Sequence, residues 1–185
     1  MKTVKKVITA LLALMLLFTF FSCNNSDDSN IPSDILLAQN DAVDYVFFYP
    51  NTWELDRNDG MIVIKPISLK TGIASASTLS VTAFSLASDK ISYGVNEEWA
   101  EYESELKKAF PSYTFKKSND DIKLGGVVAS QKEYTIVIAE QTYRFAQIIC
   151  IRNAYVYQMT FCAIDTEYDA NIKVVETVLQ YFKFK

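Results

Sequence analysis

The sequence predicts an α+β fold in which amphipathic helices lie on the faces of a central antiparallel β-sheet. Three β-prone runs, at residues 127–138, 143–151 and 155–164, follow one another with short connections, which is the pattern of an antiparallel meander. Two helical segments, at residues 95–110 and 166–182, have apolar stripes that must be buried against a sheet. Half of the 185 residues are apolar and 14% are aromatic, which is enough for one well-buried domain.

The first strands are expected before the first of these helices. Residues 43–49 are mostly β-branched or aromatic and end at Pro50, and a second run begins at Trp53. Residues 58–60, with the sequence Asn-Asp-Gly, tolerate positive φ angles and therefore favour a tight turn into the apolar run at residues 61–67. The run that begins at Trp53 and the run at residues 61–67 are predicted to form a hairpin.

Three features of this region concern where strands begin and end. Pro66 has no N–H to donate to a ladder, so the far end of its strand is expected at an edge or a bulge. The strand at residues 78–86 alternates until Phe84, where the phase changes and a bulge is expected. The apolar run at residues 35–38 either begins the fold or only leans on it, and we place the start of the domain near residue 40.

The helix at residues 95–110 has both the apolar period and the charge pattern of an α-helix. Asn96 can cap it and Pro111 ends it, while Glu103 and Lys107 form a pair four residues apart. Acidic residues lie in its first turn and basic residues in its last turn, as the helix dipole favours. Its apolar stripe consists of Trp99, Tyr102, Leu106, Ala109 and Phe110.

The remaining connections and the closing helix are assigned from local signals. Residues 119–121 predict a turn, and the Gly125-Gly126 pair predicts a bend before the meander. Thr166, with Asp169 three residues later, predicts a capping box that opens the closing helix. Its apolar stripe consists of Tyr168, Ile172, Val175, Leu179 and Phe182.

The N-terminus has the pattern of a secretory signal peptide at residues 1–22. Three lysines precede an apolar stretch at residues 7–21, interrupted only by Thr9 and Thr19. The alternative is an uncleaved membrane anchor, but the stretch is shorter than the roughly 20 residues that span a bilayer. It also stops at Ser22 without the basic flank of a stop-transfer segment. We therefore expect export and cleavage.

The residues around the cleavage point indicate a lipid anchor. Ser22 and Cys23 match the bacterial lipobox, in which a small residue precedes a cysteine that carries palmitate or a similar acyl chain. Phe20 and Phe21 are bulkier than the residues usual in that motif. The polar run that follows suits a tether, which we assign to residues 23–39, ahead of one domain at residues 40–185. The predicted location is extracytoplasmic, on a bacterial membrane.

The charge of the mature chain argues against nucleic acid as a partner. Without the three lysines of the leader, 15 basic residues face 22 acidic ones, which gives a net charge of about −7. Nucleic-acid binding needs a basic face, and the lysine pairs at residues 107–108 and 116–117 are flanked by acids or turn residues.

Several chemistries are disfavoured by the composition. The chain has no histidine, which removes the usual triads, imidazole zinc sites and histidine acid-base catalysis. Gly125 and Gly126 do not lie between a strand and a helix, as a phosphate-binding loop would require. Paired carboxylates remain possible for a glycosidase, although each acidic cluster also suits a turn, the tether or a helix surface. We expect no enzyme activity, no metal and no cofactor.

Two groups of residues are weighed as binding features. Asp56, Asn58 and Gly60 are reminiscent of a calcium loop, but the spacing fails later in the motif and a turn explains them better. The aromatic residues of two strands could present a stacking surface for a sugar or a protein, or they could pack under a helix. The residues of this possible binding surface are Tyr143, Tyr155 and Tyr157, with Trp53 as the nearest alternative.

Cys150 and Cys162 are predicted to be free thiols, although an exported protein could form a disulfide. If residues 152–154 turn the chain, Cys150 faces about Val156 and Cys162 faces about Arg144. The two sulfurs are then about 20 Å apart. A disulfide needs Cα atoms within about 7 Å.

Phe48, Tyr49, Pro50 and Trp53, together with the sheet-helix-sheet order and the closing helix before residues 182–184, resemble the PsbP-like (Mog1/PsbP) family. The resemblance implies a central antiparallel sheet with helices on its two faces, an α/β/α sandwich, and an accessory or binding role. The metal-binding histidines of the photosynthetic members are missing here.

Two functions of different class are carried forward. The first is a lipid-anchored module that binds another protein of the cell envelope, and the second is a protein that binds a small molecule or a glycan in a cleft. A carboxylate hydrolase is a weaker third. A filled core with one flat aromatic patch would favour the first, and a cavity of a few hundred cubic ångströms would favour the second.

Overall fold

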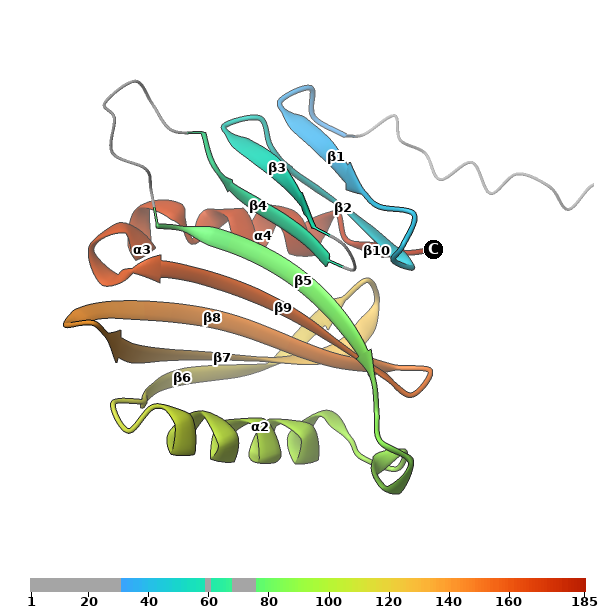
Figure 1. Ribbon diagram of the computed structural model, residues 1–185. Coiled ribbons are helices and arrows are strands. Elements are labelled where there is room, and N and C mark those ends of the chain that lie inside the picture. The colour runs from blue at the N-terminus through green and yellow to red at the C-terminus, as the bar shows by residue number, and fades with distance from the viewer. Residues whose placement is uncertain (1–30, 59–60, 68–75) are drawn as a thin grey trace, which may run out of the picture. The chain divides into compact units, whose positions relative to one another are not determined.

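The computed structural model describes residues 31–58, 61–67 and 76–185. The chain divides into two units, Met1–Pro32 and Ser33–Lys185, and the second unit holds the fold described below (Figure 1). The leader, Cys23 and residues 24–30 of the predicted tether lie outside the described residues. Within the described ranges, no helix is both long enough and apolar enough to span a membrane.

The main sheet contains seven strands, and every neighbouring pair is antiparallel. The spatial order is β3-β4-β5-β9-β8-β7-β6, so the predicted meander forms one half of the sheet and the predicted hairpin forms the other edge. The strands are β3 (Trp53–Asn58), β4 (Met61–Pro66), β5 (Thr78–Ser85), β6 (Thr114–Leu124), β7 (Val127–Ile138), β8 (Gln141–Arg152) and β9 (Tyr155–Ile164).

A second, smaller sheet has the order β1-β2-β10. It consists of β1 (Ile35–Gln39), β2 (Tyr45–Pro50) and β10 (Lys183–Phe184). All five residues of β1 pair with β2, so the folded unit begins earlier than the predicted boundary near residue 40. The local sequence signal of a five-residue strand is too weak to predict β1, because its pairing with β2 is what makes it part of the fold.

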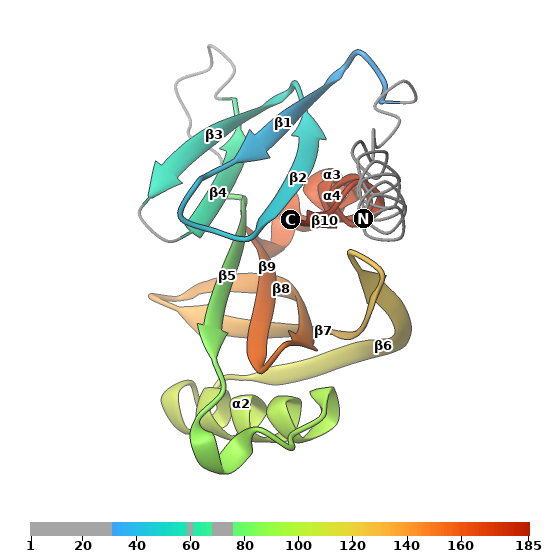
Figure 2. The ribbon, with the colours of Figure 1, turned by 90° about the vertical axis from the view of Figure 1, so that its right-hand side faces the viewer.

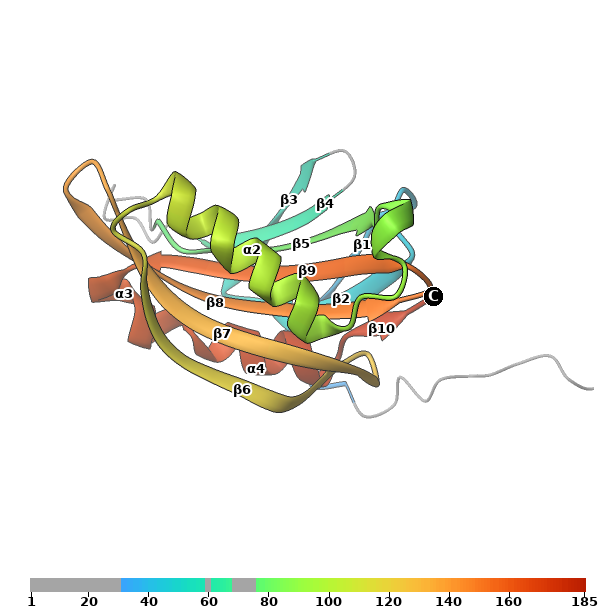
Figure 3. The same cartoon turned by 90° about the horizontal axis from the view of Figure 1, so that it is seen from below.

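The helices lie on both faces of the main sheet, which confirms the predicted α+β class. When the unit is seen from below, α2 (Val95–Ala109) crosses in front of the sheet and α4 (Lys173–Gln180) lies behind it (Figure 3). The short α3 (Asp165–Asn171) follows β9 directly, and a single 3-10 turn, η3 (Ser88–Lys90), connects β5 to α2.

The start of α2 differs from the prediction. Gly94, not Asn96, is the N-cap residue, and the Glu97 carboxylate accepts a hydrogen bond from the Gly94 N–H at 3.0 Å. The predicted pair within this helix is confirmed, since Lys107 Nζ lies 2.8 Å from Glu103 Oε1.

The closing helix is divided, and its predicted capping box is wrong. Helix α3 begins after Ile164 with no side-chain cap, and the chain turns at Ile172 before α4. Asp169 does not close a box with Thr166, because its carboxylate reaches across to Arg144 Nη1 at 3.3 Å. A partner from β8 has therefore replaced the local one.

Two predicted irregularities lie elsewhere than expected. The pairing of β5 with β9 is continuous from Thr78 to Ser85, so there is no bulge at Phe84. Residues 119–121 are not a turn, since they lie inside β6 at a register shift between Asn119 and Ile122. An edge strand can absorb such a shift because only one of its sides is paired.

Other local predictions are confirmed. Gly125 and Gly126 have φ angles of 55° and 84° and turn the chain from β6 into β7. The β4–β5 pairing stops at Ile64, before Pro66. Cys150 and Cys162 are free, although the register is one residue from our estimate: Cys150 pairs with Tyr157 and Cys162 with Phe145.

The two faces of the main sheet bury very different amounts of apolar surface. The face toward α4 and the small sheet carries the main core, which includes Tyr45, Phe47 and Phe182. The face toward α2 carries a separate cluster of four buried residues, Leu86, Trp99, Ile149 and Val156. Figure 2 shows α2 on one side of the sheet and the small sheet on the other.

Candidate functional site

The four aromatic residues predicted as a binding surface do not lie together. Tyr143 pairs with Ile164 and Tyr155 pairs with Arg152, which places these tyrosines at opposite ends of the β8–β9 hairpin. Trp53 and Tyr157 are almost fully buried, and Trp53 packs against Phe161. Tyr155 is 48% exposed and lies on the same face as Tyr157, two residues along β9. Only Tyr155 and Tyr157 are brought together.

These two tyrosines line a surface cleft of about 450 Å³, which we call the Tyr155 cleft. Its walls come from β9, from β5 and from the loop between β1 and β2. The lining residues are Ala42, Val43, Asp44, Ala83, Tyr155 and Tyr157. The cleft therefore combines one exposed aromatic ring, small apolar side chains and one carboxylate.

The carboxylate of Asp44 is held by two side chains. Tyr157 donates its hydroxyl hydrogen to Asp44 Oδ2 at 2.6 Å, and Arg152 Nη1 donates to the same oxygen at 3.2 Å. The Arg152 guanidinium also lies over the Phe184 ring, 4.6 Å from its centroid. Burial, followed by the hydrogen bond to Asp44, raises the pKa of Tyr157 to about 12. At neutral pH Tyr157 is therefore a proton-bearing donor that orients Asp44.

The loop that carries Asp44 is fixed by Lys185, the residue after β10. Lys185 Nζ donates to the carbonyl oxygens of Asn40 and Val43 at 2.9 and 2.7 Å, and the Lys185 N–H donates to the Asp44 carbonyl at 2.8 Å. Within the loop, Asn40 Oδ1 accepts the Ala42 N–H at 2.9 Å. The cleft wall is thus preformed, and a ligand there would not have to order it.

A second cleft, of about 460 Å³, lies between α2 and two strands, the edge strand β6 and its neighbour β7, and we call it the Trp99 cleft. Its lining is more polar than that of the Tyr155 cleft, with Phe115 as an exposed ring. The lining residues are Asn96, Trp99, Ala100, Glu103, Phe115, Ser118, Asp120 and Lys132.

The charges of the Trp99 cleft are largely compensated. Glu103 accepts Lys107 Nζ on one carboxylate oxygen and Lys132 Nζ on the other, both at 2.8 Å. Burial acts to raise the pKa of Glu103, but the hydrogen bonds from these two lysines outweigh it and lower the pKa to about 2. Lys132 Nζ also lies 5.0 Å from the centroid of the Trp99 ring. Asp120 accepts a hydrogen bond from Ser130 Oγ.

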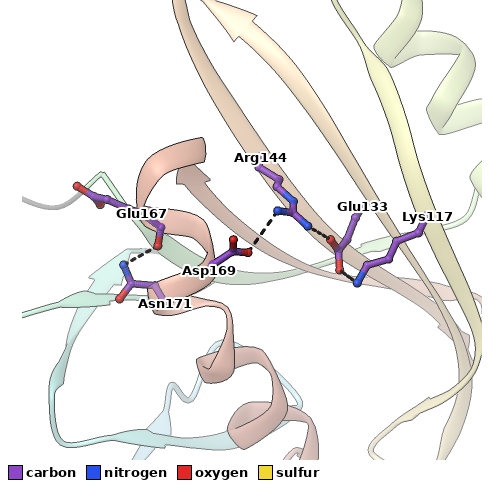
Figure 4. A network of polar contacts seen from close by, with 6 residues as sticks. All are labelled: Lys117, Glu133, Arg144, Glu167, Asp169 and Asn171. Carbon is purple, nitrogen blue, oxygen red and sulfur yellow. Dashed lines mark hydrogen bonds and ion pairs between the residues drawn. The ribbon is translucent and has the colours of Figure 1, made fainter.

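A third polar cluster connects the sheet to α3 (Figure 4). Glu133, whose side chain is 4% exposed, accepts Lys117 Nζ and Arg144 Nη2, each at 2.9 Å. Arg144 stacks over the Tyr168 ring at 4.0 Å and continues to Asp169. Burial acts to raise the pKa of Glu133, yet Lys117 and Arg144 hold it below its usual range. These contacts join β6, β7, β8 and α3, which is a structural role.

The remaining reactive groups are poorly placed for chemistry. Burial raises the pKa of Cys150 to about 12 and that of Cys162 to about 11, so both stay as thiols at neutral pH. Across the described ranges, no three potential ligands among Asp, Glu and Cys gather where they could hold a metal ion. What the arrangement offers is binding through an aromatic ring and oriented polar groups.

Sequence reasoning found Tyr155 and Tyr157 but missed Asp44, Arg152 and the Trp99 cleft. Arg152 could have been found, because a two-residue turn after it places it opposite Tyr155. Asp44 gives no local signal, since it lies 113 residues from Tyr157 in the chain. Asp120 was assigned to a turn, and the register shift in β6 is what brings it beside α2.

Comparison with solved structures identifies the fold. CyanoP, the cyanobacterial PsbP of Synechocystis sp. PCC 6803, aligns with a TM-score of 0.58 at 14% identity, over 90% of this chain and 99% of that one. Mog1p, a Ran-binding protein of Saccharomyces cerevisiae, aligns with a TM-score of 0.58 at 8% identity, over 81% of this chain and 95% of that one. The chain therefore has a PsbP/Mog1-like fold, as the sequence resemblance implied.

A third match is PA94, a Pseudomonas aeruginosa protein of unknown function, with a TM-score of 0.54 and 14% identity over 79% of this chain and 94% of that one. No protein-family model matches the sequence, and no curated protein matches it. At such low identities the likeness concerns the fold alone, and function has to be argued from the surface.

Proposed function

We propose that this protein is a binding module of the bacterial cell envelope, anchored to the membrane by a lipid on Cys23, and that it contacts a protein partner through the Tyr155 cleft. The observation that carries the proposal is the pairing of a half-exposed aromatic ring with a charged pair that the fold holds in place. The leader and the Ser22-Cys23 junction support the anchor.

The residue types at this cleft favour a protein partner. Tyrosine and arginine are enriched where protein interfaces concentrate their binding energy, because each combines a large contact area with a polar end. Tyr155 and Arg152 pair directly across β8 and β9, beside Asp44. A membrane anchor also raises the local concentration of neighbouring envelope proteins, so a modest interface suffices.

A role without catalysis is part of the proposal. It is supported by the raised pKa values of the buried Cys150 thiol and the partly buried Cys162 thiol, and by the lack of histidine in the sequence. Among the described residues, Glu103 and Glu133 are the carboxylates that each bind two cations, which suits neither a base nor a nucleophile. A structure with a ligand in which paired carboxylates flank a glycosidic bond, with turnover, would contradict it.

The lipid anchor is tested with Cys23→Ala. We expect the variant to lose its partition into the detergent phase, because the acyl chain supplies the membrane affinity. Metabolic labelling with a palmitate analogue should mark the wild-type chain and not the variant. The matched control is Cys162→Ala, which should still be labelled and still partition. A Cys23→Ala chain that stays in the detergent phase would show that the anchor is something other than this lipid.

The protein partner is tested by placing a photo-crosslinking amino acid at Tyr155 in living cells. We expect a discrete adduct of one mass at this position, which disappears when Arg152 is changed to Glu. The matched control is the same crosslinker at Val128, which is 65% exposed on β7 and outside the cleft. Equal adduct patterns at both positions would contradict a specific contact at the cleft.

A second candidate function is the binding of a small polar molecule or a glycan in the Trp99 cleft. Its volume of about 460 Å³ falls in the range of ligand sites, and it combines the exposed Phe115 ring with the side chains of Asn96, Ser118 and Asp120. N-acetylglucosamine oligomers can be titrated while tryptophan fluorescence is recorded in a Trp53→Phe variant, in which Trp99 is the remaining tryptophan. Saturable binding that Phe115→Ala abolishes would favour this function, and a flat response would exclude these sugars.

A further inference from the structure

The three edge strands of the unit that are longer than two residues differ in how well they are protected. Natural sheets protect open edges with charges, bulges or prolines, because an unprotected edge pairs with other strands. Strand β3 carries Glu54 and Asp56, and β6 has two register shifts. Strand β6 also carries five charged residues, Lys116, Lys117, Asp120, Asp121 and Lys123.

Strand β1 has none of these protections. Its sequence, Ile-Leu-Leu-Ala-Gln, contains no charge and no proline, and its register with β2 is continuous over all five residues. Among the described residues β2 is its only ladder partner, so the outer N–H and C=O groups of β1 are open to another strand. Leu36 is 44% exposed and Leu37 is 45% exposed, although each is a large apolar side chain.

We propose that β1 pairs edge to edge with β1 of a second copy of this chain, antiparallel and about a two-fold axis at Leu37. A second strand can pair with the whole open edge at once, and an antiparallel pair of identical strands is self-complementary under two-fold symmetry. In this register Leu37 faces Leu37 of the second copy, and each Leu36 faces an Ala38. Because β1 is neutral, its self-pairing brings no like charges together. Self-pairing of the charged edges β3 and β6 would bring like charges together.

The size of the contact predicts where the dimer forms. Five paired residues bury less than the roughly 1,200 Å² of a typical stable interface, so the pairing is weak in dilute solution. Two copies in one membrane meet at a much higher effective concentration. The enhancement of pairing in the membrane rests on the proposed anchor at Cys23, whereas the pairing of β1 with a second β1 does not.

The test uses a disulfide that only the proposed symmetry allows. Residues directly opposite in an antiparallel pair have Cα atoms about 4.5–5.5 Å apart, which is within disulfide reach. We would oxidise the full chain carrying Leu37→Cys in native membranes and follow the dimer by mass. The matched control is Ser118→Cys, an exposed residue on the protected edge β6.

We expect Leu37→Cys to crosslink about a hundredfold faster than Ser118→Cys, because the pairing of the two β1 strands holds the position-37 thiols together at a high effective concentration. A fluorescently labelled Leu37→Lys chain, with the wild-type cysteines, should appear as single molecules in the membrane where the labelled wild type appears as pairs, because the substitution places a charge opposite itself. Circular dichroism would establish that Leu37→Lys is folded. Equal rates at positions 37 and 118, or adducts of position 37 with a different protein, would overturn the proposal.

The same oxidation on concentrated Cys23→Ala protein separates the two proposals. If the lipid anchor is wrong but the pairing is right, Leu37→Cys still crosslinks in concentrated solution and the rate falls on dilution. If the anchor is right and the pairing wrong, the chain partitions into detergent and position 37 crosslinks no faster than position 118.

Discussion

The two faces of the main sheet are built in different ways. Toward α4 and the small sheet, aromatic rings pack in a continuous core, with Phe182 5.5 Å from Tyr45 and 5.1 Å from Phe184 between ring centroids. Toward α2, only four residues form a buried apolar cluster. Helix α2 is attached by polar contacts as well, since Trp99 Nε1 donates to the Ser130 carbonyl at 3.1 Å and Lys132 binds Glu103.

This difference indicates which face can change without loss of the fold. A densely packed core tolerates little variation in volume, because a cavity adds to the lost transfer free energy. A helix held by a few apolar and several polar contacts opens at a lower free energy than the core. The Trp99 cleft lies along this helix, so its lining can vary more freely than the core face.

The comparison predicts its largest effect for Phe182→Ala. This side chain is buried against Tyr45 and Phe47, and its ring also lies beside Gly125. We expect the free energy of unfolding to fall by about 3–5 kcal/mol, the range for a phenylalanine removed from a core. Urea unfolding followed by circular dichroism measures it. A loss below about 1 kcal/mol would mean that this face is not the main core.

A smaller effect is expected for Trp99→Phe on the opposite face. The change keeps an aromatic ring but removes the N–H that binds the Ser130 carbonyl. A buried carbonyl left without its partner costs about 1–3 kcal/mol. Hydrogen exchange should show faster opening of α2 while the amides of β8 stay protected. If the whole sheet loses protection equally, α2 is not an independent unit.

Acid should weaken the ion pairs on both faces of the main sheet, and one variant on each face tests the contribution of its carboxylate. The pKa of Glu103 is lowered to about 2 and that of Glu133 is also lowered, so each carboxylate stabilises the fold above its unfolded pKa near 4.5. This stabilisation is lost as the pH falls from about 5 towards 2. The melting temperature should drop over this range, with a smaller drop in Glu133→Gln and in Glu103→Gln. If the melting temperature of both variants falls with pH as steeply as that of the wild type, the assigned ion pairs are contradicted.

Much of the fold follows from periodicity, which reports burial of one face of an element. The meander and α2 were predictable because each is long enough for the alternation or the helical stripe to be read from its own residues. The break between α3 and α4 was not, because Asp169 is drawn away from a local cap by Arg144. Strand β1 was not predicted as part of the domain for a similar reason, since its pairing with β2 defines it.

The candidate site was less predictable than the fold. The sequence identified Tyr155 and Tyr157 as aromatic strand residues, but Tyr143 from the same reasoning lies at the other end of the hairpin. A cleft arises where distant segments meet, as Asp44 and Arg152 do across 108 residues of sequence. Periodicity states which side of a strand is buried and does not state which loop covers its end.

The smallest effect is expected for Phe84→Ser, which is the matched counterpart of Phe182→Ala. Phe84 pairs with Val156 on the face toward α2, yet it is 44% exposed and belongs to neither buried cluster. Serine therefore removes apolar surface that is already half in water, and the loss should stay below about 1 kcal/mol. Urea unfolding under the same conditions compares the same residue type on the two faces. If Phe84→Ser costs as much as Phe182→Ala, Phe84 is covered in solution by a partner or a second copy, and the open part of this face is an interface.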